Sequence, residues 1–187
     1  RRGLKRGQEN RSMGIMSNTR FRPGTPQNER FARLSVVVGD SQDFFLHQTR
    51  RTLAQLGVRD MHLARDGAEA LGLVRTQEPH LAIIDWDLKA IPGVEFTAFL
   101  RRAEGSPSPN LPIIMTMASV DRMKISRAMN AGVNEILIKP VTADALLRRI
   151  VSAIAAQHKP QVAAGAYIGP DRRQVSEPIT EERRAGT

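Results

Sequence analysis

Three aspartates and one lysine follow short apolar segments of the chain, and their types point to phosphate chemistry. Asp40 comes after Val-Val-Val-Gly, Asp85 and Asp87 come at the end of Leu-Ala-Ile-Ile, and Lys139 comes after Ile-Leu-Ile. Carboxylate oxygens in a group without His or Cys are the hard ligands that Mg²⁺ takes, usually together with several waters. An ammonium beside them can contact a phosphoryl group as a point charge. These residues indicate a site for Mg²⁺ and a phosphoryl group, provided that the fold brings them together.

The segments around these residues alternate between two hydrophobic patterns. Short continuous apolar runs are typical of buried strands, and the stretches between them carry apolar residues at helical spacing. Such strands separated by helices predict an α/β fold, a five-stranded parallel sheet that is doubly wound with helices on both faces. In this kind of sheet, ligands bind beyond the carboxyl ends of the strands, where the aspartates and the lysine lie. The predicted strands are residues 34–38, 61–64, 81–84, 112–115 and 135–138, and the predicted helices are residues 45–56, 66–74, 96–100, 121–131 and 142–156.

Positive charge is concentrated near the N-terminus. The 187 residues carry a net charge of +9, yet residues 34–156 have fourteen basic against thirteen acidic side chains, whereas residues 1–33 have nine against two. We therefore predict a basic disordered arm (1–33), one folded domain (34–156) and a flexible tail (157–187). The tail contains one candidate docking motif, Tyr-Ile-Gly-Pro-Asp-Arg-Arg (167–173). A DNA-binding domain would need on the order of 60 further residues with a core, so nucleic acid is not the expected partner.

Composition excludes several classes of site. The chain has no Cys, which excludes disulfides, thiolate metal sites and cysteine nucleophiles and agrees with a cytoplasmic location. Its four His show no metal-ligand spacing. No apolar run approaches the roughly 18 residues that a membrane-spanning helix needs, and no signal-peptide pattern is present. The sequence begins at Arg1, and Met16 followed by Ser-Asn-Thr is the expected true start.

Four motifs in fixed order resemble a known family. Together they are similar to the response-regulator receiver domain of two-component signalling, a single CheY-like domain with the flavodoxin-like (βα)5 fold, across about residues 33–156. Any one of them alone would be a weak signal, and their order and spacing make the resemblance specific. The motifs are Val-Val-Val-Gly-Asp (36–40), Ile-Ile-Asp-Trp-Asp-Leu (83–88) followed by Pro-Gly (92–93), Leu-Pro-Ile-Ile-Met-Thr-Met-Ala (111–118) and Ile-Lys-Pro (138–140).

This resemblance implies a role for each residue at the strand ends. Asp85 would be the phosphoacceptor and would receive phosphate from a sensor histidine kinase or a phosphotransfer protein. Asp40 and Asp85 would bind Mg²⁺ through their side chains and Asp87 through its backbone carbonyl, while Lys139 would contact the phosphoryl oxygens. The Lys139–Pro140 peptide bond would be cis, a form that is essentially confined to bonds before proline. The domain would signal by protein–protein contact and would not be an enzyme.

Three positions depart from the family pattern. Gly39 stands where the family usually has a second acid beside Asp40, so we expect Mg²⁺ binding to be weakened without being lost. Met117 stands where the family has a Thr or Ser hydroxyl that bonds the phosphoryl group, and Met has no donor. Thr116 points to the opposite face of the pleated strand, so we expect that it does not replace that hydroxyl. Ile136 stands where the family often has an aromatic switch residue.

These departures leave the acceptor residues complete and alter those that convert phosphorylation into movement. We expect any response to pass through Lys139, through backbone donors near Ala118, or through the helix that begins near Asp121.

Two alternatives to the phosphoacceptor remain open. Gly39 and Met117 favour a degenerate receiver that is never phosphorylated and serves as a protein interaction module. Asp-Trp-Asp (85–87) also resembles the nucleophile motif of haloacid-dehalogenase-type phosphatases. That motif should open its domain, however, and two strand–helix units precede it in this chain.

Overall fold

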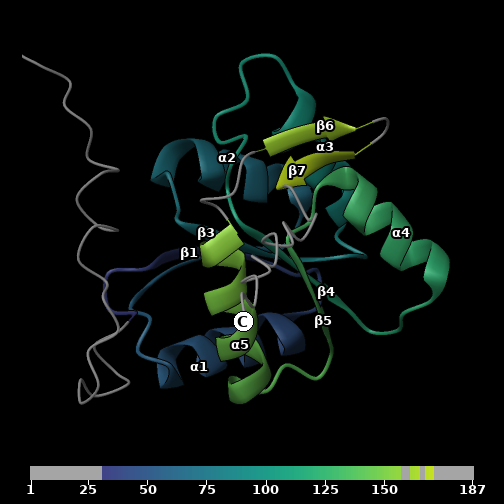
Figure 1. The fold of residues 1–187 in the computed structure, drawn as a ribbon. Helices are drawn as coiled ribbons and strands as arrows, with labels where there is room; N and C mark the ends of the chain where they lie inside the picture. The colour runs from purple at the N-terminus through teal and green to yellow at the C-terminus, as the bar shows by residue number, and fades with distance from the viewer. Residues whose placement is uncertain (1–30, 157–160, 165–166, 171–187) are drawn as a thin grey trace, which may run out of the picture.

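One parallel sheet organises the part of the chain that the structure describes. The computed structural model describes residues 31–156, 161–164 and 167–170. Its five-stranded sheet has the order β2-β1-β3-β4-β5, and all neighbouring strands are parallel. Figure 1 shows the sheet among its helices. The predicted five-stranded, parallel, doubly wound fold is therefore confirmed. The strands are β1 (Ser35–Gly39), β2 (Asp60–Ala64), β3 (Leu81–Asp85), β4 (Ile113–Met117) and β5 (Glu135–Ile138).

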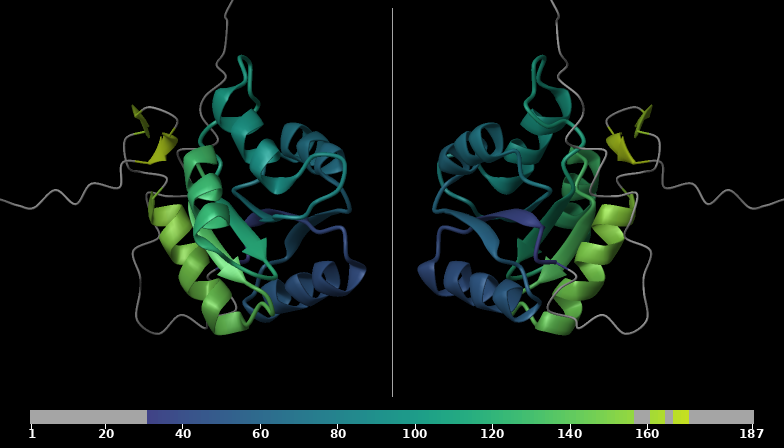
Figure 2. Two further views of the ribbon diagram at one scale, coloured as in Figure 1. Left: turned by 90° about the vertical axis from the view of Figure 1, so that its right-hand side faces the viewer. Right: turned by 90° about the vertical axis from the view of Figure 1, so that its left-hand side faces the viewer.

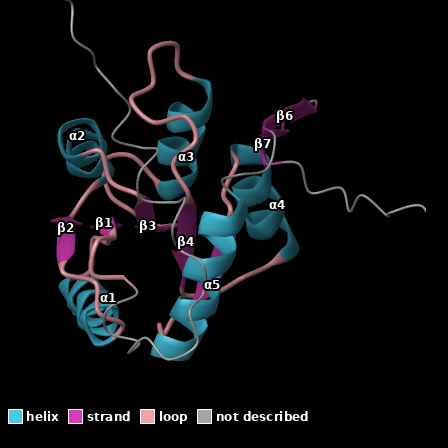
Figure 3. Cartoon of the chain, turned by 60° about the vertical axis from the view of Figure 1, so that its left-hand side comes forward, coloured by secondary structure: helices cyan, strands magenta, loops and turns pink. Residues whose placement is uncertain are grey.

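Helices cover both faces of this sheet, so that it forms the middle of three layers (Figure 2). α1 and α5 lie on one face, and α2, α3 and α4 lie on the other (Figure 3). We refer to these as the α1–α5 face and the α2–α4 face. The helices are α1 (Asp43–Gln55), α2 (Gly67–Gln77), α3 (Gly93–Arg102), α4 (Arg122–Ala131) and α5 (Ala143–Ala156).

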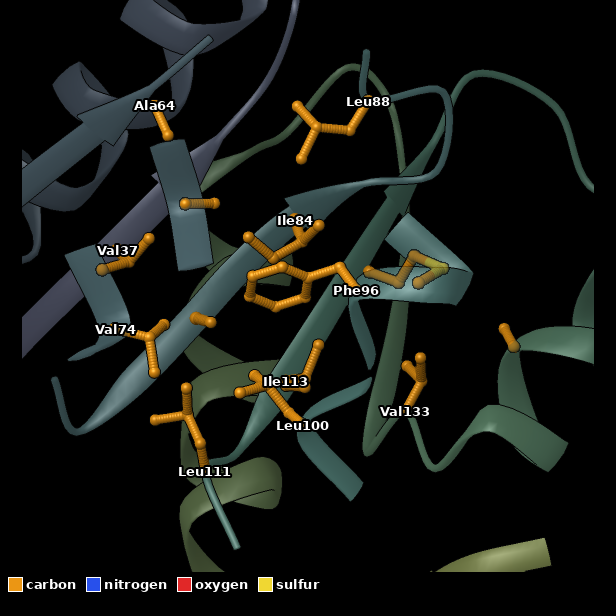
Figure 4. Packing of buried hydrophobic residues seen from close by; sticks show 14 of the residues in the cluster. Val37, Ala64, Val74, Ile84, Leu88, Phe96, Leu100, Leu111, Ile113 and Val133 are labelled. Carbon is orange, nitrogen blue, oxygen red and sulfur yellow. The ribbon is translucent and has the colours of Figure 1, made fainter. Parts of the chain in front are cut away.

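Alternation of side chains along each strand divides the buried residues into two cores. In β3, Leu81 and Ile83 belong to the core on the α1–α5 face, whereas Ala82 and Ile84 belong to the core on the α2–α4 face. The second core surrounds Phe96 of α3, which is fully buried (Figure 4). Truncating such a side chain to Ala costs about 3–5 kcal/mol. Both cores thus fix the strand ends relative to one another.

The start of α3 differs from the prediction. This helix begins at Gly93 and not at Phe96, and it continues to Arg102. A Cβ on Gly93 would lie 2.4 Å from the carbonyl oxygen of Asp85, so a residue without a side chain is needed where α3 approaches the end of β3. Asp66 caps the start of α2, because its carboxylate accepts the Glu69 N–H at 2.8 Å.

α3 and α4 are attached to the domain in different ways. In α4 only Ala128 and Ala131 are buried. In α3 five residues are buried, including Arg101. The Arg101 guanidinium donates to the carbonyl oxygens of Pro109, Leu111 and Gly132 and to Asn134 Oδ1. Charge-assisted bonds of this kind are roughly twice as strong as neutral ones. They attach the end of α3 to the loop that follows it and to the loop between α4 and β5.

Two short strands follow the domain. β6 (Gln161–Ala164) and β7 (Tyr167–Pro170) pair antiparallel, and β7 lies against α4 and α3. The candidate docking motif therefore begins in β7, and its residues 171–173 lie outside the described part of the chain, as do residues 1–30 of the predicted arm. Among the described helices, none is both long and apolar enough to cross a membrane.

Candidate functional site

Three charged side chains meet where β1, β3 and β5 end. Lys139 Nζ lies 2.6 Å from Asp40 Oδ2 and 2.8 Å from Asp85 Oδ1. The side chains of all three are almost completely buried, with at most 4% of their surface exposed. A buried ammonium between two buried carboxylates is a strong local interaction, because little solvent screens it. The predicted convergence of Asp40, Asp85 and Lys139 is therefore present.

Backbone contacts hold two of these residues in place. The Asp40 N–H donates to the Ala64 carbonyl at 3.1 Å, which continues the pairing of β1 with β2 by one residue. Asp40 Oδ1 accepts the Gln42 N–H at 2.9 Å, so the other oxygen is left for Lys139. The Lys139 N–H donates to the Met117 carbonyl at 2.8 Å and fixes the start of its side chain beside the end of β4.

Lys139 is also packed against an aromatic ring. Its Nζ lies 4.3 Å from the centroid of the Phe45 ring in α1, a cation–π contact that contributes more when it is shielded from water. The Lys139–Pro140 peptide bond is cis, as the resemblance implied. From the sequence, Phe45 was predicted only as part of a helix, although it follows Asp40 by five residues.

A hydroxyl from β4 joins the site. Thr116 is paired with Asp85 across the β3–β4 ladder, and its Oγ1 donates to Asp85 Oδ1 at 3.3 Å. The expectation that Thr116 lies on the opposite face of the strand from Met117 is correct, since Met117 is buried in the core of the α2–α4 face. The contact between the Thr116 hydroxyl and Asp85 was not predicted, and it arises because Thr116 and Asp85 are paired and lie on the same face of the sheet. We call Asp40, Asp85, Lys139 and Thr116 the acceptor cluster.

The environment of Asp85 raises the pKa of this carboxyl. Burial is the main cause and raises its pKa above the ordinary 3.8. The hydrogen bond and the charge of Lys139 lower the pKa, and the negative charges of Asp40 and Asp87 raise it again, with a net upward direction. A more basic carboxylate is a better nucleophile towards phosphorus once it has lost its proton.

The three positions that depart from the family pattern lie in or against the core of the α2–α4 face. A Cβ on Gly39 would lie 3.0 Å from Ile84 Cδ1 and 3.3 Å from Leu88 Cδ2, so apolar groups fill the direction that a second acid would take. Met117 is fully buried there, and Ile136 packs against the same core. We call Gly39, Met117 and Ile136 the switch positions.

Two other predicted residues lie on the surface beside the acceptor cluster. Asp87 and Ala118 are both exposed, and Asp87 acts on Asp85 through its charge. Between residues 31 and 156, no group of three or more His, Cys, Asp or Glu side chains could hold a metal ion. The donors that remain are the carboxylates of Asp40 and Asp85, which are close enough to share one ammonium. Two carboxylates against one ammonium leave excess negative charge, and Mg²⁺ is commonly bound by one or two carboxylates. The residues present therefore fit this ion.

Trp86 occupies the side of the site towards α4. Arg127 Cζ lies 5.5 Å and Lys124 Nζ lies 5.9 Å from the centroid of its ring. A hollow of about 360 Å³ adjoins the ring and is lined by Trp86, Asp87, Leu88, Pro92, Val94, Glu95 and Arg127. The indole of Trp86, the residue that follows Asp85 in the chain, is thus in contact with the cations of α4.

A second hollow lies on the face formed by α4, β5 and α5. Its volume is about 480 Å³. Ile138 is half exposed beside it, and Val120 and Ile125 are also partly exposed. The lining is mainly apolar and comprises Val120, Ile125, Met129, Glu135, Ile136, Leu137, Ile138, Ala145, Arg148 and Arg149.

Comparison with known proteins agrees with this geometry. The chain is 26% identical over 117 residues to the chemotaxis protein CheY-3 of Vibrio cholerae, covering 63% of this chain and 88% of that protein. It is 26% identical over 117 residues to the chemotaxis protein CheY of Pseudomonas aeruginosa, covering 63% of this chain and 93% of the relative.

Solved structures show the same fold. The signal receiver domain of a modulated diguanylate cyclase from Desulfovibrio desulfuricans superposes with a TM-score of 0.59 and 30% identity, covering 66% of this chain and 95% of that one. The receiver domain of an HD domain-containing protein from Pseudomonas fluorescens gives a TM-score of 0.59 and 27% identity, covering 67% and 97%. A sequence model of the response regulator receiver domain matches residues 36–151. The chain therefore belongs to the response-regulator receiver domain family.

Proposed function

We propose that this receiver is a phosphoacceptor in a two-component relay, with Asp85 taking phosphate from a histidine kinase or a phosphotransfer protein. The observation that carries the proposal is the buried Lys139 ammonium, which lies within 2.8 Å of carboxylate oxygens of both Asp40 and Asp85. A structural ion pair would need only one carboxylate. The second leaves negative charge that a divalent cation can balance, at the place where a phosphoryl group would arrive.

The chemistry would be an in-line transfer. A carboxylate oxygen of Asp85 attacks phosphorus, the new O–P bond forms, and the bond to the donor nitrogen breaks with its electron pair leaving on the imidazole. Lys139 is close enough to neutralise charge on the transferred group. Asp40, Asp85 and the backbone carbonyl of Asp87 would hold Mg²⁺, which supplies further charge neutralisation at the phosphoryl oxygens when bound.

An unphosphorylated interaction module is the second candidate, and the packing at Gly39 favours it. Ile84 and Leu88 fill the space beside this residue, so the domain has been packed without the second acid. The phosphatase alternative has no such support. β1, α1, β2 and α2 precede Asp85, whereas the nucleophile motif of that family should open the domain.

Output in either case would be contact with another protein. The apolar hollow between α4, β5 and α5 is the surface we propose for it, because the partly exposed Val120, Ile125 and Ile138 gather beside it. A partner that covers this hollow with apolar side chains would remove them from water, at about 25 cal/mol for each Å² buried.

Phosphorylation is tested with the single tryptophan of the chain. Trp86 follows Asp85 directly, so titration with Mg²⁺ and then with beryllofluoride or acetyl phosphate should change its fluorescence. The response to both phosphoryl reagents should vanish in Asp85→Asn and persist in the control Asp60→Asn, whose carboxylate lies at the start of β2, away from the strand ends that carry the site. Acid-labile phosphate should form on the parent and on the control. A parent with no fluorescence response and no acid-labile phosphate would leave the interaction module as the function.

A further inference from the structure

The two oxygens of the Asp85 carboxylate have different surroundings. Oδ1 accepts from Lys139 Nζ at 2.8 Å and from Thr116 Oγ1 at 3.3 Å. Lysine is always a donor and an ionised carboxylate is always an acceptor, so the threonine hydroxyl must donate here. For Oδ2 the structure gives no hydrogen bond. Within the described residues Gln48 Oε1 is the only buried side-chain polar atom without a partner. Oδ2 therefore keeps some contact with solvent, although the Asp85 side chain as a whole is only 4% exposed.

Strand register places Thr116 at Asp85. The ladder pairs Asp85 with Thr116, and the Trp86 N–H donates to the Thr116 carbonyl at 2.9 Å. The strand pairing at Asp85 and the hydrogen bond from Trp86 therefore hold the Thr116 backbone in register with Asp85. Thr116 is buried, with 3% of its surface exposed, so water does not compete for its hydroxyl.

We propose that Thr116 is a positioning residue for the acceptor: together with Lys139 it holds Oδ1 of Asp85, the oxygen that would also bind Mg²⁺, and so leaves Oδ2 as the oxygen that receives the phosphoryl group. This inference rests on the proposed function. Two donors on one oxygen restrict rotation of the carboxylate about its Cβ–Cγ bond, which keeps the second oxygen aimed at the open side of the site. Oδ2 then forms the bond to phosphorus, and the leaving group departs with the electron pair of the bond that breaks. The role differs from that of a hydroxyl at position 117, because Thr116 acts on the carboxylate before transfer.

Three variants test the role. Thr116→Val keeps the shape and removes the donor, Thr116→Ser keeps the donor, and Thr97→Val is a matched control because the buried Thr97 hydroxyl donates within α3 to the Gly93 carbonyl at 2.8 Å. Phosphorylation by acetyl phosphate with Mg²⁺ is followed as a function of donor concentration. The bond from the Thr116 hydroxyl to the carboxylate is long, at 3.3 Å, so Thr116→Val should lower the maximal rate by about fivefold, which corresponds to about 1 kcal/mol. The half-saturating donor concentration should stay unchanged, Thr116→Ser should recover the rate, and Thr97→Val should match the parent.

A structure of the beryllofluoride adduct gives a readout that does not depend on rates. Beryllium should be bonded to the Asp85 oxygen that does not contact Thr116. Beryllium on the oxygen that Thr116 contacts would overturn the inference, as would Thr116→Val phosphorylated as fast as the parent, or Thr116→Ser as slow as Thr116→Val. Each of these outcomes leaves Asp85 as a phosphoacceptor. A parent that takes no phosphate would overturn the proposed function and this inference with it.

Discussion

The acceptor cluster and the switch positions lie on different sides of the sheet, and Gly39 and Met117 end their strands beside the cluster. Asp85 and Thr116 share the α1–α5 side of their strands, and Lys139 contacts Phe45 of α1. The switch positions lie in or against the core of the α2–α4 face, where apolar atoms surround them. Charge is therefore concentrated on one side and apolar packing on the other. The residues that would accept a phosphoryl group are therefore present, while apolar core residues occupy the positions that would respond to it.

Removing Lys139 should give the largest effect. Lys139→Met leaves two buried carboxylates without their common ammonium, and breaking a buried ion pair on one side costs about 3–5 kcal/mol. Urea unfolding should show this loss, and acid-labile phosphate should fall strongly. Lys89→Met, at an exposed lysine in the loop after β3, is the control and should unfold like the parent. Equal midpoints for both variants would mean that the acceptor cluster is not a buried charge site.

Placing a hydroxyl at position 117 tests the apolar packing on the α2–α4 face. In Met117→Thr the new side chain is smaller and polar within the core of the α2–α4 face, so it leaves a cavity and an unsatisfied hydroxyl, with an expected loss of about 2–3 kcal/mol. Met117→Leu, which keeps apolar volume, should cost less than about 1.5 kcal/mol. Unfolding in urea measures both variants. If Met117→Thr is as stable as Met117→Leu, position 117 reaches polar groups or solvent and the contrast between the two sides fails.

The smallest effect is expected from Asp85→Asn, and it depends on pH. Because burial raises the pKa of Asp85, the folded state keeps this proton to higher pH than the unfolded state. As the pH rises from about 3.8 through the raised pKa, the parent loses stability that the non-titrating Asn does not lose. Unfolding free energies without Mg²⁺ should therefore shift in favour of the variant from acid to neutral pH. If the difference in unfolding free energy between variant and parent is independent of pH, or shifts in favour of the parent, then burial does not raise the pKa of Asp85.

The sequence predicted the strand ends better than the contacts between strands. Asp40, Asp85 and Lys139 could be placed together because each follows an apolar run, and parallel strands all end at one edge. The contact of Thr116 with Asp85 was not predicted, because pleat alternation compares neighbours within one strand, whereas this contact depends on the β3–β4 register. The register depends on how all the side chains of that face of the sheet pack, so it cannot be predicted from either strand alone. The same applies to Gly93, whose place at the start of α3 follows from its closeness to the Asp85 carbonyl.

The shallow attachment of α4 has a consequence for how a charge at Asp85 could be felt elsewhere. Only Ala128 and Ala131 of this helix are buried, and each contributes a single methyl group to the core. Opening the first turns of α4 exposes little apolar surface, so the free energy of such local opening is small compared with global unfolding. Amide hydrogens there should exchange with deuterium sooner than those of α3, whose end is held by the Arg101 guanidinium. We therefore expect α4, the helix that contacts Trp86, to open locally at a lower free energy than α3.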